Sequence, residues 1–229
     1  MKNFIVIGHR GAPAYEPENT LKSFRRALEL GADGIELDVR FTADGVPVVF
    51  HDEDLKRLFN MDVKLNSLTL HQIRELKIDG ESIPTLEEVV REFGKRTIMF
   101  IELKEVGREE EVVRIIRENG DIEKTLIISF HPEALRNVKR VEPHAEVGLL
   151  VYRPPVRIRD ALELKCSAML PHYSLVTPRL VQELHAHGLA VYVWTVNDVA
   201  LAKKMRGYGV NGIATDRPDI KRLIESTRI

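Results

Sequence analysis

The stretch Gly31-Ala-Asp-Gly-Ile-Glu-Leu-Asp-Val-Arg40 indicates the fold most clearly. In it, three apolar residues alternate with the acidic residues Glu36 and Asp38. Residues two apart on a β-strand point to the same face, so the two carboxylates should project together while the apolar side chains pack behind them. An isolated strand of this kind is typical of a sheet edge with its acidic face in water. The neighbouring His9-Arg10-Gly11 and His51-Asp52 indicate a functional site instead.

Composition limits the classes of protein that the chain can belong to. Its 229 residues, 44% of them hydrophobic, suit a single α/β barrel with a sizeable core. The formal net charge of −1 predicts no general attraction to nucleic acid or to anionic membranes. A single cysteine, Cys166, excludes an internal disulfide and a cysteine-built metal site, so we expect a cytoplasmic protein. The first apolar run, residues 4–7, is too short for a signal peptide or a membrane span, and no stable membrane insertion is expected.

Short apolar runs alternate with amphipathic stretches along the whole chain, which predicts β/α alternation and a parallel sheet. Asp44-Gly45 is a hairpin signal, so residues 46–50 should fold back beside residues 39–42 on the barrel rim. The remaining strands each precede a helix, which predicts a (β/α)8 TIM barrel. An open doubly wound sheet is the competing architecture, but no glycine-rich dinucleotide turn supports it. The strand candidates are residues 4–7, 34–39, 46–50, 98–103, 126–129, 147–151, 168–171, 190–194 and 212–214.

Local signals also mark helix ends and one interruption of the pattern. Asn19 or Thr20 should cap the first helix, and Asp198 a later one. Residues 53–83 are too long for a plain loop and contain one short helical pattern, residues 70–76, which predicts a small insertion at the barrel mouth after the second strand. No linker or repeat is evident, so residues 1–229 are expected to form one domain.

Chemically active side chains fall at or near the C-terminal ends of the predicted strands, where barrel enzymes place their active sites. Three of them are carboxylates, Glu36, Asp38 and Glu102, and no cysteine accompanies them. Carboxylates prefer a hard cation, so one divalent ion, Mg²⁺ or Ca²⁺, is expected. The full set is His9, Arg10, Glu36, Asp38, His51, Glu102, Lys104, Ser129 and Trp194.

The remaining charged groups fit the cleavage of a phosphoester. His9 and His51 titrate near neutrality, as a general acid and a general base require. Arg10 offers a planar fork for phosphate oxygens and Lys104 a point charge. Together with a metal ion, these groups could stabilise the charge that develops on a phosphate.

The motifs resemble the glycerophosphodiester phosphodiesterase family along nearly the whole chain. This resemblance implies a metal-dependent barrel that hydrolyses deacylated phospholipids, as small-molecule substrates, to glycerol 3-phosphate and an alcohol. The matching motifs are His9-Arg10-Gly11, Pro17-Glu18-Asn19-Thr20, Gly31-Ala32-Asp33, Ile35-Glu36-Leu37-Asp38-Val39, Thr42 with Asp44-Gly45, Val48-Val49-Phe50-His51-Asp52, Ile83-Pro84-Thr85-Leu86-Glu87, Ile101-Glu102-Leu103-Lys104, Ser129-Phe130, Trp194-Thr195-Val196-Asn197, and Gly209-Val210, Gly212-Ile213, Thr215-Asp216 and Pro218.

The resemblance assigns roles to individual positions. It implies His9 and His51 as the acid/base pair, and it implies a substrate-pocket aromatic at Trp194. The metal ligands implied are Glu36, Asp38 and Glu102, and the phosphate contacts implied are Arg10 and Lys104. The chain departs from the family after Asp52, where the usual run rich in Arg, Thr and Gly reads Leu55-Lys56-Arg57-Leu58-Phe59-Asn60-Met61.

Several residues also have a plain structural interpretation. Glu18-Asn19 is expected to be a helix-entry cap rather than a catalytic pair. Ser129 is interpreted either as a substrate contact or as a strand-end hydroxyl, and Trp194 either as pocket or as core. The other histidines are expected on the surface or in packing, with His172 the foremost exception.

Two other functions compete with hydrolysis of glycerophosphodiesters. A lysophospholipase D or a phospholipase C-like lyase would use the same groups on lipids, and Leu55, Leu58, Phe59 and Met61 could provide an apolar approach. A barrel that only binds phosphodiesters would not need a histidine pair. The sequence leaves open the ion, the alcohol, the first nucleophile (water or a substrate hydroxyl) and the oligomeric state.

Overall fold

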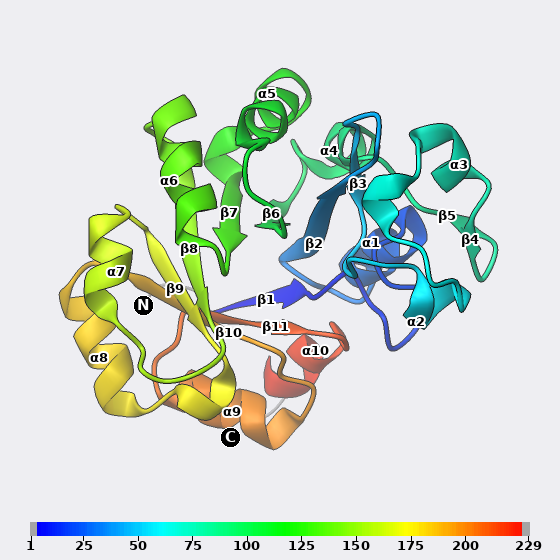
Figure 1. Cartoon of the computed structure of the whole chain (residues 1–229). Helices are drawn as coiled ribbons and strands as arrows, with labels where there is room; N and C mark the ends of the chain where they lie inside the picture. The colour runs from blue at the N-terminus through cyan, green and yellow to red at the C-terminus, as the bar shows by residue number, and fades with distance from the viewer. Residues whose placement is uncertain (1–3, 226–229) are drawn as a thin grey trace.

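A computed structural model of the protein describes residues 4–225. Parallel strands close into a barrel because β1 pairs with β11 on one side and with β2 on the other. Figure 1 shows these strands surrounded by the helices. The (β/α)8 barrel predicted from the sequence is confirmed. In order around the barrel the strands are β1 (Ile5–Gly8), β2 (Gly34–Phe41), β6 (Ile98–Leu103), β7 (Thr125–Ser129), β8 (Glu146–Val151), β9 (Ala168–Pro171), β10 (Ala190–Val193) and β11 (Gly212–Thr215).

Helices cover the outside of the barrel, one after each strand. The sequence patterns predict six of them. α5 (Glu109–Asn119) and α7 (Ile158–Glu163) are not among the predicted helices, although the buried apolar residues of α5, Val112, Val113, Ile115 and Ile116, have helical spacing. Among residues 4–225, no helix is both long enough and apolar enough to cross a membrane. The outer helices are α1 (Leu21–Glu29), α4 (Leu86–Phe93), α5 (Glu109–Asn119), α6 (Pro132–Val141), α7 (Ile158–Glu163), α8 (Pro178–Ala186), α9 (Val199–Gly207) and α10 (Ile220–Glu225), with short 3₁₀ turns η2 (Ile122–Lys124) and η3 (Tyr173–Leu175).

The alternation along β2 separates two environments. Ile35, Leu37 and Val39 are fully buried in the core between the barrel and the helices. Side chains of the alternate positions point into the barrel, so Glu36 and Asp38 face its interior together, as predicted. Below them the interior is filled by apolar residues: Ile7, Phe100, Leu126, Ile128, Leu150, Ala168 and Leu170. The acidic side chains of β2 therefore lie at the C-terminal end of the barrel, above this apolar layer.

A rim hairpin carries the chain back to the barrel mouth. β3 (Pro47–Val49) runs antiparallel to β2, with Arg40 opposite Val48. The turn is closed by the Thr42 hydroxyl, which donates to Asp44 over 2.6 Å, and Gly45 has a φ of +81° that favours glycine. The predicted hairpin outside the eight-strand barrel is confirmed, and it delivers His51 to the mouth.

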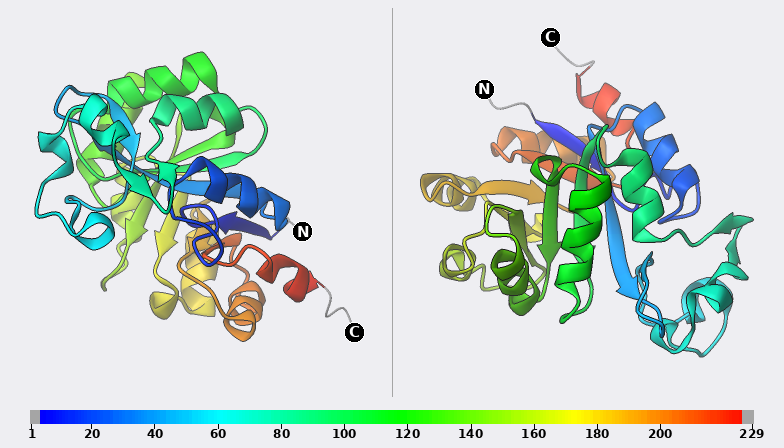
Figure 2. Two further views of the ribbon diagram at one scale, coloured as in Figure 1. Left: turned by 90° about the vertical axis from the view of Figure 1, so that its right-hand side faces the viewer. Right: turned by 90° about the horizontal axis from the view of Figure 1, so that it is seen from above.

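The insertion that follows has a small hydrophobic core of its own. The sequence pattern predicts only one helical segment here, residues 70–76, whereas the structure has four short elements and a 3₁₀ turn. Elements of two to five residues are too short to show a hydrophobic period in the sequence. Figure 2 shows the insertion on the side of the molecule away from β1 and α10. Its elements are α2 (Lys56–Phe59), η1 (Leu65–Ser67), α3 (Leu70–Arg74), β4 (Lys77–Ile78) and β5 (Glu81–Ser82), packed around Val48, Phe50, Leu55, Leu65, Ile73, Ile78 and Ile83.

Candidate active site

A cavity at the C-terminal end of the barrel has one polar and one apolar side. The polar side is formed by His9, Arg10, Glu36, His51, Glu102 and Lys104. The apolar side is formed by Phe100, Ile128, Phe130, Leu150, Leu170, Trp194 and Ala214. The structure therefore brings together seven of the nine residues selected from the sequence, and Asp38 lies directly beneath them, in contact with Lys104.

Three buried carboxylates converge at the base of this cavity. One oxygen each from Glu36, Asp38 and Glu102 lies within 4.8 Å of the others. Burial, reinforced by the negative charge of Asp38, raises the pKa of Glu36 to about 7 and that of Glu102 to about 8. Burial also opposes ionisation of Asp38, but Lys104 and Arg10 hold its pKa well below the ordinary value. Three oxygen donors that close together suit a hard divalent cation, which would displace the protons from the two glutamates.

Two cationic side chains lie against the acidic triad. Nζ of Lys104 lies 2.9 Å from Oδ1 of Asp38 and 2.7 Å from Oε1 of Glu102. Nε of Arg10 lies 3.3 Å from Oδ2 of Asp38, and the backbone N–H of Arg10 donates to Glu36 over 2.8 Å. These cations balance part of the buried negative charge and line the cavity where an anionic group could bind.

His9 is oriented by an aspartate from the far end of the chain. Its Nδ1 lies 2.7 Å from Oδ1 of Asp216, whose other carboxylate oxygen accepts from the side-chain amide of Asn197 over 2.6 Å. The partner on Nδ1 leaves Nε2 for the cavity. Burial lowers the pKa of His9, but the hydrogen bond to Asp216 and the charge of Glu36 outweigh it and raise the pKa above the ordinary value. Asp216 and Asn197 were not selected as site residues from the sequence, although both lie in the motifs that resemble the family.

His51 has the same arrangement with the opposite electrostatic result. Its Nδ1 lies 2.6 Å from Oδ1 of the adjacent Asp52. The carbonyl of His51 accepts a 2.8 Å hydrogen bond from Nε of Arg40, which fixes the backbone. Burial, together with the positive charges of Lys104 and Arg10, lowers the pKa of His51 despite the nearby carboxylates. Relative to an ordinary histidine, the surroundings of His9 therefore favour its charged form and those of His51 its neutral form.

The expected helix cap at Glu18-Asn19 is wrong, whereas the alternative cap at Thr20 is confirmed. The cap of α1 is the neighbouring Thr20, whose hydroxyl accepts from the backbone N–H of Ser23 over 3.1 Å. Asn19, at a φ of +58°, is buried, and its side-chain amide donates to Oδ2 of Asp38 over 2.8 Å. Glu18 accepts a 3.0 Å hydrogen bond from Nη1 of Arg10. Both residues support the site, and the unusual φ of Asn19 is maintained where the buried Asp38 carboxylate needs a hydrogen-bond partner.

A tight turn after β1 places Arg10. Arg10 has a φ of +52° and Gly11 a φ of +91°. A Cβ at Gly11 would lie 2.4 Å from the Ser23 hydroxyl oxygen, so only glycine allows the turn to approach α1 this closely. The sequence His9-Arg10-Gly11 therefore directs two functional side chains into the barrel from consecutive positions.

The two remaining selected residues differ in their surroundings. The Ser129 hydroxyl is fully buried, donates to the Leu103 carbonyl over 2.7 Å and accepts from the His131 N–H over 3.0 Å. It does not line the cavity, so we assign it to the strand end rather than to substrate. Trp194 lines the cavity, and its indole N–H donates to the Leu170 carbonyl over 2.7 Å.

Aromatic rings surround Trp194 at the rim. Its ring lies 5.5 Å from that of Phe130 and 5.9 Å from that of Tyr152, measured between ring centroids. His172, the foremost exception among the remaining histidines, lies 5.3 Å away by the same measure but does not line the cavity. The aromatic group holds Trp194 as a rigid wall of the apolar side.

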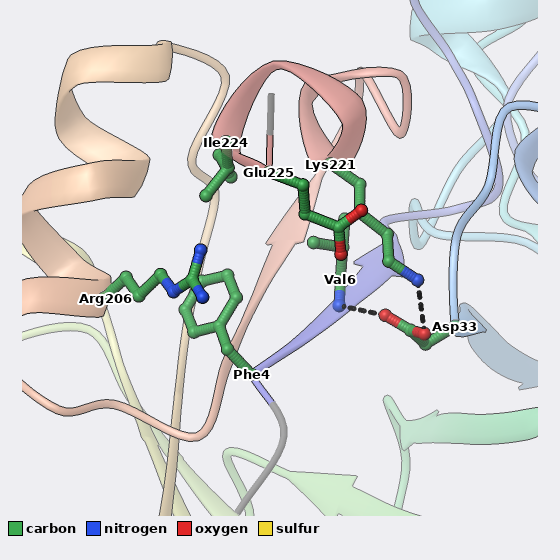
Figure 3. Close-up of a pocket in the computed structure, with 7 residues that line it drawn as sticks. All are labelled: Phe4, Val6, Asp33, Arg206, Lys221, Ile224 and Glu225. Atoms are coloured by element: carbon green, nitrogen blue, oxygen red, sulfur yellow. Dashed lines mark hydrogen bonds and ion pairs between the residues drawn. The ribbon is translucent and has the colours of Figure 1, made fainter. Parts of the chain in front are cut away.

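A second cavity, of about 540 Å³, lies at the opposite end of the barrel near the start of β1. Figure 3 shows that two of its charged groups are paired with each other: Asp33 accepts from the backbone N–H of Val6 over 2.8 Å and forms an ion pair with Lys221. Arg206 lies over the ring of Phe4. No histidine is among its described lining residues, so we find the chemically competent groups at the C-terminal end.

A (β/α)8 barrel with this acidic triad, two histidines and two cations at its mouth is suited to the hydrolysis of a phosphate ester. Residues 9–220 match the sequence model of the Glycerophosphoryl diester phosphodiesterase family. The chain belongs to this family.

Individual relatives agree with this assignment. A glycerophosphodiester phosphodiesterase of Caldanaerobacter subterraneus subsp. tengcongensis is 38% identical over 230 residues, which cover 94% of this chain and 95% of the relative. A solved glycerophosphodiester phosphodiesterase of Thermotoga maritima is 31% identical, with a TM-score of 0.85 and coverage of 98% and 99%. A phosphodiesterase of Oleispira antarctica, solved with the product sn-glycerol-3-phosphate, is 30% identical, with a TM-score of 0.88 and coverage of 97% and 95%.

Proposed function

We propose that the chain hydrolyses glycerophosphodiesters to glycerol 3-phosphate and an alcohol in a metal-dependent reaction. The observation that carries the proposal is a buried triad of carboxylates flanked by two histidines, each with a carboxylate on Nδ1. The Oleispira antarctica relative holds glycerol 3-phosphate as a product, which supports the same product here.

One divalent cation, Mg²⁺ or Ca²⁺, would be held by Glu36, Asp38 and Glu102. The donor set fits, because three buried oxygens converge and two of the carboxylates have pKa values raised into the neutral range. When bound, the ion supplies Lewis-acid stabilisation of charge on the phosphate oxygens. Asn19 holds Asp38 from behind, as a ligand of this kind requires.

The histidines supply the proton transfers. His51 lies near the cations Lys104 and Arg10 and is the proposed base, which accepts a proton from the attacking hydroxyl. If that hydroxyl belongs to water, glycerol 3-phosphate forms directly. If it belongs to the substrate's glycerol, a cyclic phosphate forms, which water must then open to give glycerol 3-phosphate. His9, hydrogen-bonded to Asp216 and close to Glu36, is the proposed acid, which donates its Nε2 proton to the departing alkoxide. Each Nδ1 partner keeps its ring in a fixed orientation.

The remaining cavity residues bind and orient the substrate. Arg10 and Lys104 would contact the phosphate oxygens, since both line the cavity beside the triad. Trp194 and the apolar side would contact the carbon atoms of the substrate and exclude water from them.

Deacylated substrates are favoured over lipids by the structure of the insertion. Of the four residues that could provide an apolar approach, Leu55 is fully buried, and Leu58 and Phe59 pack against the core of the insertion. Leu58 and Phe59 are half-buried, and Met61, at 38% exposure, is the most exposed of the four. Most of these apolar side chains therefore pack inside the insertion, where they are not available to contact an acyl chain. The cytoplasmic location expected from the sequence remains a prediction.

A direct comparison of substrates tests this function. The purified chain, supplied with Mg²⁺ or Ca²⁺, is given glycerophosphocholine and, separately, lysophosphatidylcholine, and released glycerol 3-phosphate and choline are measured. We expect rapid release of glycerol 3-phosphate from the first compound and little turnover of the second. Preferential turnover of the lysolipid would replace this function with a lysophospholipase D.

A further inference from the structure

Arg57 of the insertion bonds to two carboxylates that each touch a proposed functional residue. Its Nε donates to Oδ2 of Asp52 over 2.6 Å. Its Nη1 and Nη2 donate to the two oxygens of Glu18 over 2.9 and 2.6 Å. The donors of a guanidinium lie in one plane, so this double contact fixes both carboxylates in direction as well as in distance.

The same two carboxylates continue into the active site. Oδ1 of Asp52 lies 2.6 Å from Nδ1 of His51, and Oε1 of Glu18 accepts from Nη1 of Arg10 over 3.0 Å. Arg57 lines a charged hollow outside His51 and does not line the central cavity. Its contacts reach the central cavity through the two carboxylates that it holds.

The core of the insertion holds Arg57 in turn. Arg57 lies on α2, whose last residue, Phe59, stacks on Phe50 with 6.3 Å between the ring centroids. Phe50 is buried and directly precedes His51. The packing of Phe59 on Phe50 thus helps to place both Arg57 and His51, the two residues that Asp52 joins by hydrogen bonds.

We propose that Arg57 is a positioning residue, which holds Asp52 and Glu18 so that His51 and Arg10 point at the phosphate. This inference rests on the proposed function of the site. Without Arg57, Asp52 can rotate and His51 loses its fixed direction. Glu18 would also keep Arg10 as its only guanidinium partner and draw it away from Asp38. Displacements of this kind reduce turnover because the reacting groups must be aligned.

The test compares Arg57→Gln with Arg25→Gln, a matched control. Arg25 forms a similar two-bond pair with Glu92, at 2.6 and 2.7 Å, on the outer surface away from the site. Both variants lose the paired hydrogen bonds of a partly exposed guanidinium, so both should lose a similar amount of thermal stability. We expect R57Q to lower kcat about 10- to 100-fold with a much smaller change in KM, and R25Q to leave both unchanged.

Two further variants separate positioning from a general structural effect. Arg57→Lys should recover part of the lost kcat, because an ammonium group can pair with one carboxylate but cannot form the fork; it also serves if R57Q fails to fold. In an Asp52→Asn background, R57Q should cause a clearly smaller loss than in the wild type, because both changes release His51 and only the Glu18–Arg10 contact is then left to disturb.

The outcomes are distinct. An active wild type whose R57Q variant turns over as fast as R25Q overturns this inference alone. Full additivity of R57Q and D52N also overturns it, because Arg57 would then not act on His51 through Asp52. A wild type that releases no glycerol 3-phosphate contradicts the proposed function itself, and this inference falls with it.

Discussion

His9 and Asp216 are 207 residues apart in sequence, yet Nδ1 of the histidine lies 2.7 Å from Oδ1 of the aspartate. The pair joins the end of β1 to the end of β11, and these strands are neighbours only because the barrel closes. Closure of the barrel therefore does more than complete the fold, because it gives the first histidine the partner that orients it and raises its pKa.

The pH dependence of turnover should show a broad plateau. His51 must be neutral to act as base, so the rate rises with pH through the lowered pKa of His51. His9 must be protonated to act as acid, so the rate falls as pH rises through the raised pKa of His9. The rising part of the pH profile is its acidic limb and the falling part its alkaline limb, and the two pKa shifts move these limbs apart. A profile of kcat/KM against pH measures the separation of the limbs.

Substitution of the aspartates assigns each limb to a histidine. Asp216→Asn removes a contact that raises the pKa of His9, so the alkaline limb should move to lower pH. Asp52→Asn should likewise move the acidic limb to lower pH. Asp198→Asn, an exposed helix-cap position, should leave both limbs in place. Movement of the acidic limb in D216N would show that the roles of the two histidines are reversed.

Removal of either histidine should affect chemistry and not folding. We expect His9→Ala and His51→Ala each to lower kcat by about 10²- to 10⁴-fold, the usual contribution of a positioned acid or base. The exposed His144→Ala is the control and should retain full turnover. Circular dichroism checks the fold of all three. A near-normal rate in either site variant removes that histidine from the mechanism.

Metal affinity should increase with pH up to about 8. The pKa values of Glu36 and Glu102, about 7 and about 8, imply that a cation must displace protons from these carboxylates. Calorimetric titration with Mg²⁺ or Ca²⁺ in buffers of different ionisation enthalpy measures the protons released. Glu102→Gln should weaken binding strongly, and the outer-surface Glu92→Gln should not. Affinity that is independent of pH would contradict a triad that is partly protonated without a bound cation.

Ser129→Ala should reduce stability without raising KM. The variant leaves the Leu103 carbonyl and the His131 N–H without their buried partner, which costs about 1–3 kcal/mol in the free energy of unfolding. Denaturant unfolding measures this loss. A KM that rises several-fold while stability is unchanged would restore Ser129 as a substrate contact.

Alternation and turn chemistry made the fold predictable. The apolar face of β2 and the Asp44-Gly45 turn predict where Glu36, Asp38 and His51 lie, because strand periodicity and hairpin signals are local. The short elements of the insertion carry no such period, so their packing around Leu65 could not be predicted from the sequence.

The supporting residues of the site were not predictable in the same way. Asn19 carries a strong local signal for a helix cap, but the structure gives that place to Thr20 and turns Asn19 toward Asp38. The partners Asp216 of His9 and Arg57 of Asp52 depend on which strands and helices meet in three dimensions. Sequence patterns thus predict the side chains at strand ends, whereas tertiary contacts decide which groups orient them.

The most direct test of metal-dependent hydrolysis by this site is the initial rate of glycerol 3-phosphate release from glycerophosphocholine by the purified chain, measured in excess chelator and again after Mg²⁺ or Ca²⁺ is added beyond the chelator. The predicted result is a rate near background in chelator that is restored by the added ion. A full rate in chelator would contradict the role of the triad as a metal site, and no release under either condition would contradict the proposed activity.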